Sequence, residues 1–415
     1  MSGEGAMGTC APLWNYPAFD HEELLREHGS PLFLFFPGIL QRNVHSLSGA
    51  FRSRYPNHVI AYSVKTNHLP CVVQRAVACG AVPEIVAGLE LDLVERLGLI
   101  DGRTVVNGPF KTESELRRLV SYRCRLNVEN VTELEVLERI GAETDTDVKI
   151  GLRVSWETGN VPWKRFGFRL GAVLEMARHI KAEMPHLRVV GLHVHGGTNI
   201  TDTAYYREAA LSLCDLARQM EHSGLPELAY LDLGGGFATS CPFKDSAEWY
   251  TPSAAEYADA VVGPIVDTFG TAGPTLIVEP GRYLIDDAFL LLTTVERFRE
   301  HGRHEVIVDA GINVLPSARF RRHRIACLTR STSACEEFTI FGPLCMQSDC
   351  LGEGVALPSL RCGDVLAIDH AGAYSISQAW NFIQLLPAVV AIEDGKSVLV
   401  RRRQTIDDFL GRDVL

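Results

Sequence analysis

Short apolar runs rich in β-branched residues recur through the first two-thirds of the chain and alternate with segments of helical spacing. The helical segments carry apolar residues three and four positions apart, as in 113–119, 131–140, 171–184 and 205–222. The runs typical of strands are 58–65, 82–87, 104–109, 123–129, 147–155, 188–196, 228–235 and 274–281. Eight strands alternating with helices predict a parallel (β/α)8 barrel of the TIM type rather than an open doubly wound sheet.

The pattern changes after Arg282, where strand-like runs follow one another with few helical segments between them. These runs are 288–297, 305–310, 338–341, 364–368, 389–392 and 397–400. They predict a C-terminal β-barrel or β-sandwich domain. Because residues 31–36 also have the pattern of a strand, we expect the β domain to be assembled from both ends of the chain. The predicted domains are the barrel at 37–285 and the β domain at 1–36 and 286–415.

Composition and charge narrow the function classes. With 40 Lys and Arg against 51 Asp and Glu, the net charge is -11 and the positive residues are scattered, so a nucleic-acid partner is not expected. The most apolar stretch is far shorter than the roughly 20 residues of a membrane helix, and nothing has the pattern of a signal peptide, so we predict a cytoplasmic protein. The 11 cysteines form no paired CxxC pattern, and we predict no metal site. With these partners excluded, we expect the protein to act on a small-molecule substrate.

Polar residues collect at the ends of the predicted strands, where a (β/α)8 barrel carries its chemistry. Lys65 ends an apolar strand in YSVKTN, and desolvation there would favour the neutral amine that Schiff-base chemistry needs. The alternative is an ordinary surface lysine. The other polar residues at strand ends are Glu84, Asn107, Glu129, Arg153, His193 with His195, and Glu279 with Arg282.

The last two predicted barrel strands end in an anion-binding pattern. Gly234, Gly235 and Gly236 in LDLGGGF lack side chains, so their backbone N–H groups can approach an anion, and barrels often bind phosphate here. A plain tight turn is the alternative. Glu279 in IVEPGRY needs a cationic partner, and a protonated pyridine nitrogen would serve. Arg282 could reach the same phosphate, or it could pair with Glu279.

Further candidates lie in HVHGGTN and in the β domain. We expect His193 and His195 to point to opposite faces of their strand, so that one ring at the barrel mouth stacks on a flat cofactor and the other is structural. Thr198 could bind the phosphate of that cofactor. Cys345 in FGPLCMQSDCL and Tyr374 in GAYSISQAWNFI are candidates of the β domain, and each could instead be a buried core residue.

Eight motifs, in order, resemble the fold-type III pyridoxal-phosphate decarboxylases, the group of diaminopimelate, ornithine and arginine decarboxylases. The motifs are YSVKTN, RFGF, HVHGGTN, LDLGGGF, EPGRY, DAG, GPLCMQSD and GAY. Each is short, but eight in this order at barrel spacing are specific. The resemblance implies an alanine-racemase-like barrel, pyridoxal 5′-phosphate (PLP) as cofactor, and a homodimer with shared active sites.

The resemblance also assigns roles residue by residue. It makes Lys65 the lysine that binds the cofactor as a Schiff base, His195 the ring stacked on it and Glu279 the partner of the pyridine nitrogen. Cys345 would be the acid that returns a proton to Cα, delivered across a dimer interface. The residues implied for the phosphate are Thr198, Gly234, Gly235, Gly236, Arg282 and Tyr374, and those implied as further support of the cofactor are Glu84 and Arg153.

Two departures from the family pattern concern the substrate. Members that act on basic or diamino acids usually have an acidic residue directly after the cysteine, whereas this chain has Met346. The diaminopimelate enzymes also carry an arginine after DAG that binds a substrate carboxylate, and DAGINVLPSARF lacks it. Asp309 remains available for the substrate. The nearby arginines, Arg319, Arg321 and Arg322, could form a displaced anion site or an exposed basic loop.

We therefore predict a PLP-dependent amino-acid decarboxylase acting on a specialised or conjugated amino acid, not on plain ornithine, lysine or diaminopimelate. The alternatives are a racemase or epimerase of the same fold, a non-catalytic decarboxylase-like binding protein, and an aldolase-type barrel that uses Lys65 directly on a carbonyl. Cys345 favours decarboxylation over racemisation, and the retained lysine and phosphate ligands argue against a binding protein.

Overall fold

The chain folds as two compact units in the computed structural model, which describes residues 16–86, 88–156, 165–299, 304–330 and 334–414. The first unit comprises residues 41–238 and 250–284, and the second comprises the described residues among 1–40, 239–249 and 285–415. Residues 239–249 therefore fold with the second unit, although the sequence pattern had placed them in the barrel. Each unit is described by itself below.

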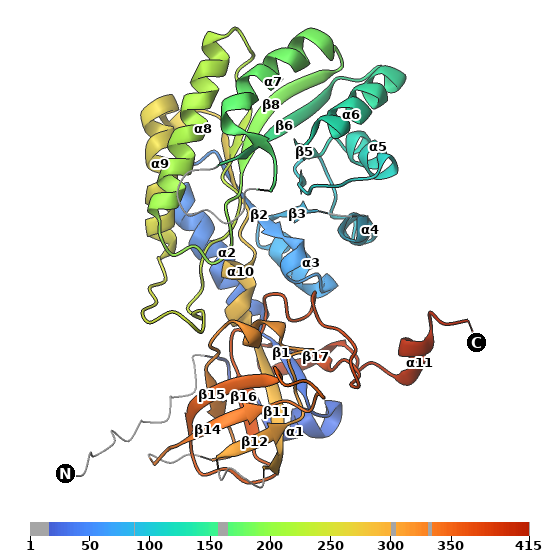
Figure 1. Ribbon diagram of the computed structural model, residues 1–415, viewed down its shortest axis with the longest axis vertical. Helices are drawn as coiled ribbons and strands as arrows, with labels where there is room; N and C mark the ends of the chain where they lie inside the picture. The colour runs from blue at the N-terminus through green and yellow to red at the C-terminus, as the bar shows by residue number, and fades with distance from the viewer. Residues whose placement is uncertain (1–15, 87, 157–164, 300–303, 331–333, 415) are drawn as a thin grey trace, which may run out of the picture. The chain divides into compact units, whose positions relative to one another are not determined.

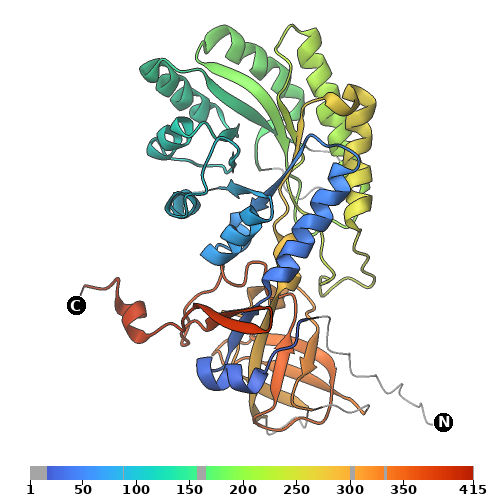
Figure 2. The same cartoon turned by 180° about the vertical axis from the view of Figure 1, so that it is seen from behind.

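The first unit is built around a closed parallel barrel of eight strands (Figures 1 and 2). Its strands are β2 (His58–Ser63), β3 (Val82–Ile85), β4 (Val105–Val106), β5 (Arg125–Val128), β6 (Val148–Ser155), β8 (Leu187–Val194), β9 (Tyr230–Asp232) and β10 (Thr275–Val278). Neighbouring strands pair in that order, β10 returns to β2, and the short β7 (Phe168–Arg169) pairs with β6 outside the ring. The predicted TIM-type barrel is confirmed.

The helices that connect successive strands lie around the outside of the barrel, and the unit has one further helix before its first strand and a short one after its last (Figure 1). They are α2 (Pro37–Arg52), α3 (Pro70–Ala78), α4 (Gly88–Arg96), α5 (Glu113–Ser121), α6 (Val131–Thr144), α7 (Leu170–Glu183), α8 (Ala204–His222), α9 (Ala254–Phe269) and α10 (Arg282–Ile285). The start of α5 is fixed by a capping box in which Thr112 and Glu115 each accept the other's backbone N–H. Among the described helices, none is both long and apolar enough to cross a membrane.

One tyrosine fills the barrel interior below the mouth. Tyr230 on β9 is 3% exposed and packs with the apolar cluster that includes Val105 and Ile277. A Cβ atom at Gly191 would lie 2.2 Å from its ring, and one at Gly151 would lie 2.3 Å from its hydroxyl oxygen. These two strand glycines therefore make room for the ring, which brings a phenol hydroxyl into the barrel interior.

The second unit is a mixed β-sheet structure. Its strands are β1 (Leu32–Phe35), β11 (Phe289–Phe298), β12 (Glu305–Val308), β13 (Ile325–Cys327), β14 (Glu336–Phe341), β15 (Cys350–Leu357), β16 (Val365–Ile368), β17 (Ala388–Glu393) and β18 (Lys396–Arg401), with helices α1 (His21–His28) and α11 (Ile406–Leu410). β1 pairs antiparallel with β11 and parallel with β17, so both ends of the chain do contribute to this sheet. The sequence pattern had missed β13 and β15.

Candidate active site at the carboxyl ends of the barrel strands

Lys65 lies on a single 3₁₀ turn (Val64–Thr66) that follows β2, where the sequence pattern had continued the strand. Its Nζ donates to Glu84 Oε2 at 2.7 Å, and the lysine side chain is 40% exposed while the glutamate is fully buried. Asn107 donates to the second oxygen of Glu84 at 2.9 Å. The turn therefore presents an accessible amine that is anchored to a carboxylate on the neighbouring strand.

Glu279 follows β10 and is the second buried carboxylate of the site. Asn107 Nδ2 donates to its Oε1 at 2.6 Å, so one amide bridges Glu84 and Glu279. His193 Nε2 lies 3.6 Å from Glu279 Oε2. Burial alone would raise the pKa of Glu279, but the neighbouring charges, led by His193, lower it below its ordinary range. The barrel therefore holds an ionised carboxylate out of water.

The expectation that His193 and His195 point to opposite faces is wrong. Residues two apart on a strand share a face, so both rings lie inside the barrel. His193 approaches Glu279, and His195 Nδ1 accepts the Gly235 N–H at 3.0 Å. This bond places the proton of a neutral His195 on Nε2. Burial, reinforced by the Arg153 charge, lowers the pKa of His195 to about 3.

The low pKa of His195 predicts a pH-dependent stability. The unfolded chain binds a proton at this histidine near pH 6.5 and the folded chain does not, so the free energy of unfolding falls as the pH drops below 6.5 toward 3. We expect His195→Gln to remove about 1 kcal/mol of the loss between pH 6.5 and 5.5. Urea unfolding at both pH values measures it, with the exposed His179→Gln as control. Identical pH dependence in H195Q and the unaltered protein would disprove this role.

Arg153 at the mouth is buried and is held in place by an ion pair with Glu129. Its Nη1 donates to Glu129, and its guanidinium lies 4.7 Å from the centre of the Phe166 ring. Behind this pair, Lys111 Nζ contacts Glu133 Oε1 at 2.5 Å and Glu133 Oε2 accepts the Glu129 N–H. Two linked ion pairs therefore fix the arginine.

The three glycines of LDLGGGF are required by close packing. A Cβ at Gly234, Gly235 or Gly236 would lie 2.5, 2.3 or 2.7 Å from a backbone carbonyl oxygen of another strand end. Two of the N–H groups expected to face an anion are already used, because Gly234 donates to Asp232 Oδ1 and Gly235 to His195 Nδ1. The glycines therefore bring strand ends together, and their role in binding the cofactor phosphate stays a prediction.

The remaining predicted phosphate residues of the barrel unit differ in burial. Thr198 is exposed in the loop after β8, whereas Arg282 is only 7% exposed at the start of α10. A Cβ at Gly281 would lie 2.0 Å from Thr66 Oγ1, so the segment that carries Glu279 and Arg282 packs tightly on the Lys65 turn. Their phosphate-binding roles stay predictions.

The sheet unit carries the other predicted residues. Cys345 is exposed, and Met346 beside it is half-buried. Tyr374 is half-buried with a φ of 66°, a conformation that residues other than glycine seldom adopt. Asp309 Oδ1 accepts bonds from the Thr293 hydroxyl at 2.7 Å and the Thr294 N–H at 2.9 Å, so this oxygen is used within the sheet. The roles of these residues in substrate and cofactor binding stay predictions.

The three arginines after DAG do not form one basic surface. Arg321 is 1% exposed, and its Nη2 donates to Thr239 Oγ1 at 3.0 Å and lies 3.8 Å from Asp286 Oδ2. Arg321 therefore joins residues 239–249 to the rest of the sheet unit. Its burial contradicts the exposed basic loop at this residue, and the displaced anion site stays a prediction. Arg319 and Arg322 are exposed.

The sequence reasoning missed three polar residues inside the barrel: Asn127, Tyr230 and Asp232. All are 3% exposed or less. Asn127 Nδ2 donates to Asn107 Oδ1 at 2.9 Å and to Asp232 Oδ2 at 3.3 Å, while Tyr230 donates to Asn127 Oδ1 at 2.9 Å. Each interrupts an apolar strand, which is the signal that would have found them.

Comparison with known proteins places this arrangement in a family. Residues 41–286 match the pyridoxal-binding domain of the pyridoxal-dependent decarboxylases, and residues 249–372 match the C-terminal sheet domain of the same enzymes. The chain belongs to the pyridoxal-dependent decarboxylase family. The members that these domains define are pyridoxal-dependent decarboxylases, which favours decarboxylation over the aldolase, racemase and binding-protein alternatives.

The relatives resemble the chain over nearly its whole length. The diaminopimelate decarboxylase of Aquifex aeolicus is 29% identical over 399 residues, covering 93% of this chain and 92% of the relative. That of Bacillus subtilis is 28% identical over 411 residues, covering 94% and 93%. The crystal structure of the M. jannaschii diaminopimelate decarboxylase in co-complex with L-lysine has a TM-score of 0.87 at 27% identity, covering 96% and 95%.

The residues of the barrel mouth fit PLP. An accessible amine, a buried ionised carboxylate and a glycine-lined junction of strand ends match the aldehyde, the pyridine nitrogen and the close backbone approach that this cofactor requires. Lys65, Glu279 and His195 would hold it, with Glu84 and Arg153 behind them. When bound, PLP supplies an electron sink for the electron pair left on Cα.

Proposed function

We propose that this decarboxylase acts on an amino acid without a simple cation at the end of its side chain, such as an amino-acid conjugate of a biosynthetic pathway. The observation that carries the proposal is the loop at 342–350. Asp349 is the only acidic residue there, and its oxygens accept the Ile312 N–H at 2.8 Å and the Leu344 N–H at 2.7 Å. Met346 follows the cysteine, at the position where family members that act on basic or diamino acids usually have an acidic residue. The loop therefore offers a thioether and no uncommitted carboxylate.

In the proposed reaction, the bond between Cα and the carboxylate carbon breaks, CO2 leaves and the electron pair stays on Cα. A proton must then reach Cα, and we assign its delivery to the exposed thiol of Cys345. Lys65, held by Glu84, would bind the cofactor, give way to the substrate amine, and release the product by displacing the product's amine. We further propose that the enzyme works as a homodimer in which Cys345 serves the partner's site.

Diaminopimelate is the second candidate substrate. The names of the relatives favour it, since several with 27% to 29% identity over at least 93% of this chain are diaminopimelate decarboxylases. The two candidates differ in what the substrate presents at its far end, because diaminopimelate carries an ammonium and a carboxylate there.

A substrate panel separates the two candidates. We expect the purified enzyme with PLP to release CO2 from a conjugated amino acid at least about 100-fold more efficiently, in kcat/KM, than from diaminopimelate, lysine or ornithine, as expected for one lost charge-assisted contact. Chiral analysis of the remaining substrate measures any racemisation. Efficient turnover of diaminopimelate would overturn the proposal and leave the second candidate.

The loop itself can be tested by restoring a carboxylate. We expect Met346→Glu to raise kcat/KM for diaminopimelate, lysine or ornithine by about 10-fold or more, because a carboxylate beside Cys345 would pair with the distal ammonium group. Met346→Leu keeps the size and lacks the charge, so it serves as the matched control. If M346E and M346L have the same substrate profile, the residue after the cysteine does not select the side chain.

A further inference from the structure

A directional hydrogen-bond network lies inside the barrel beneath the candidate site. Tyr230 donates to Asn127 Oδ1 at 2.9 Å, and Asn127 donates in turn to Asn107 Oδ1 at 2.9 Å. Asn107 Nδ2 donates one N–H to Glu84 Oε1 at 2.9 Å and the other to Glu279 Oε1 at 2.6 Å. These contacts fix which end of each amide donates. These donations therefore run from Tyr230 through the two amides to the two carboxylates at the mouth.

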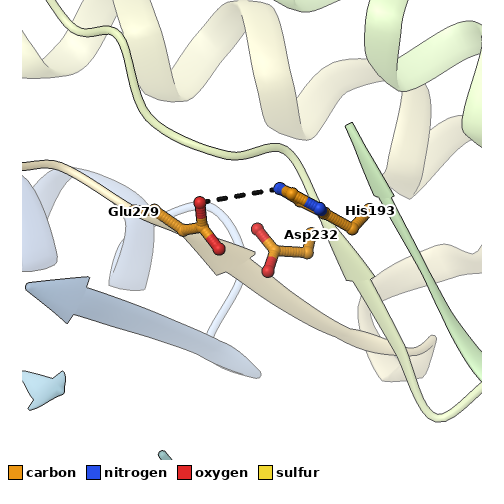
Figure 3. A group of neighbouring side chains, drawn as sticks. All are labelled: His193, Asp232 and Glu279. Atoms are coloured by element: carbon orange, nitrogen blue, oxygen red, sulfur yellow. Dashed lines mark ion pairs between the residues drawn. The ribbon is translucent and has the colours of Figure 1, made fainter. Parts of the chain in front are cut away.

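Asp232 joins this network beside Glu279. It lies on β9 between His193 on β8 and Glu279 after β10, and Figure 3 shows the three side chains turned toward one another. One ligand atom from each lies within 4.8 Å of the others. The Gly234 N–H donates to Asp232 Oδ1 at 3.0 Å and Asn127 Nδ2 to Oδ2 at 3.3 Å. Both oxygens already accept bonds from neutral donors.

Two carboxyl groups this close and this buried cannot both be ionised. Asp232 is 0% exposed and Glu279 is 5% exposed. Burial raises the pKa of Asp232 well above its ordinary value, and the Glu279 charge raises it further. The neighbouring charges of His193 and Lys65 and a hydrogen bond from Asp232 act on Glu279 in the opposite direction. The proton of the pair belongs on Asp232, and the charge on Glu279.

We propose that Asp232 is a positioning residue that stays protonated at neutral pH and donates its hydrogen to Glu279. Glu279 then receives two hydrogen bonds, from Asn107 and Asp232, and remains the anion that the pyridine nitrogen of the cofactor needs. Asp232 would act through Glu279, without touching the substrate. The inference rests on the PLP cofactor that family membership assigns.

A bound metal ion is the competing explanation for the same cluster. His193, Asp232 and Glu279 offer imidazole and carboxylate donors, and they form the one such group among the described residues. A metal ion would require both carboxylates to be deprotonated. The protonated Asp232 proposed here and a metal site are therefore mutually exclusive.

Infrared spectroscopy of the cofactor-free, full-length protein tests the proton directly. In the difference between unaltered protein and Asp232→Asn at pH 7, we expect the C=O band of a protonated carboxylic acid to disappear, with no loss of carboxylate bands. Asp215→Asn is the control, because Asp215 is exposed on α8 and its removal should delete carboxylate bands instead. Loss of carboxylate bands in D232N would overturn the proposal.

Cofactor affinity gives a second measurement. We expect Asp232→Ala to raise the Kd for PLP by about 10- to 100-fold, the usual effect of losing a hydrogen bond to a charged group. Asp232→Asn keeps a neutral donor toward Glu279 but loses the acceptor of one N–H bond, so its Kd should rise less than that of D232A. If D232N loses as much affinity as D232A, or if zinc binds stoichiometrically and competes with PLP, the proposal is wrong. A protein that binds no PLP would refute the decarboxylase function, and the infrared result would still decide the state of Asp232.

Discussion

Replacing Lys65 with alanine is expected to abolish covalent cofactor binding and to lower decarboxylation by about 10³-fold or more. Lys65 presents an amine that is 40% exposed and anchored to Glu84 at 2.7 Å. Lys111, another lysine near a barrel strand end, is 2% exposed in its side chain and bound to Glu133. It cannot take over without breaking a buried ion pair. The measurement is the visible absorbance of the PLP-bound protein, followed by borohydride reduction and peptide mapping.

The control for this prediction is Lys149→Ala, which removes an exposed lysine from β6. It should retain the absorbance band and the activity. An added small primary amine should partly restore activity to K65A, because the variant is expected to fold normally and to lack only the amine group. An adduct that maps to another lysine, or K65A activity within about tenfold of the unaltered enzyme, would contradict the assignment.

The barrel could be predicted because its strands differ from its helices in period and length. The eight runs are mainly apolar, and in β6 every residue except Lys149 is buried, which is typical of parallel strands. The position of Lys65, Glu84 and Glu279 at strand ends then marked them as candidate site residues, before any interatomic distance was known. The short β4 kept only Val105–Val106 of the run at 104–109, because its next residue, Asn107, turns to serve the site.

The buried network could not be predicted in the same way. Asn127 and Asp232 interrupt apolar strands, and a strand pattern does not tell which polar residue faces a ligand and which faces another polar residue. The role of these residues depends on closure of the barrel, which brings Asn127 Nδ2 on β5 to 3.3 Å from Asp232 Oδ2 on β9. The burial of Arg321 is a similar case, since its partners Thr239 and Asp286 are distant in sequence.

Alanine at position 235 is expected to weaken PLP binding by about 100-fold and to destabilise the protein by roughly 1–3 kcal/mol. The new Cβ would lie 2.3 Å from the Glu279 carbonyl oxygen, which is backbone and cannot rotate away. Gly235 also donates its N–H to His195 at 3.0 Å and accepts the Tyr206 hydroxyl at 3.0 Å. Any shift that relieves the collision therefore displaces Glu279 or His195. Absorbance titration with PLP and urea unfolding measure the two effects.

The matched control is Gly171→Ala on α7, where nothing lies within 4 Å of the added Cβ. That variant should bind PLP normally and gain up to about 1 kcal/mol, because alanine is the better helix former. The comparison separates the effect of adding a methyl group from the effect of pushing two strand ends apart, for both PLP affinity and the free energy of unfolding. If G235A binds PLP within about threefold of the unaltered protein, the strand ends at Gly235 and Glu279 can part without loss. Close packing would then not be what the glycines of LDLGGGF supply, and a backbone contact to the ligand would have to explain them.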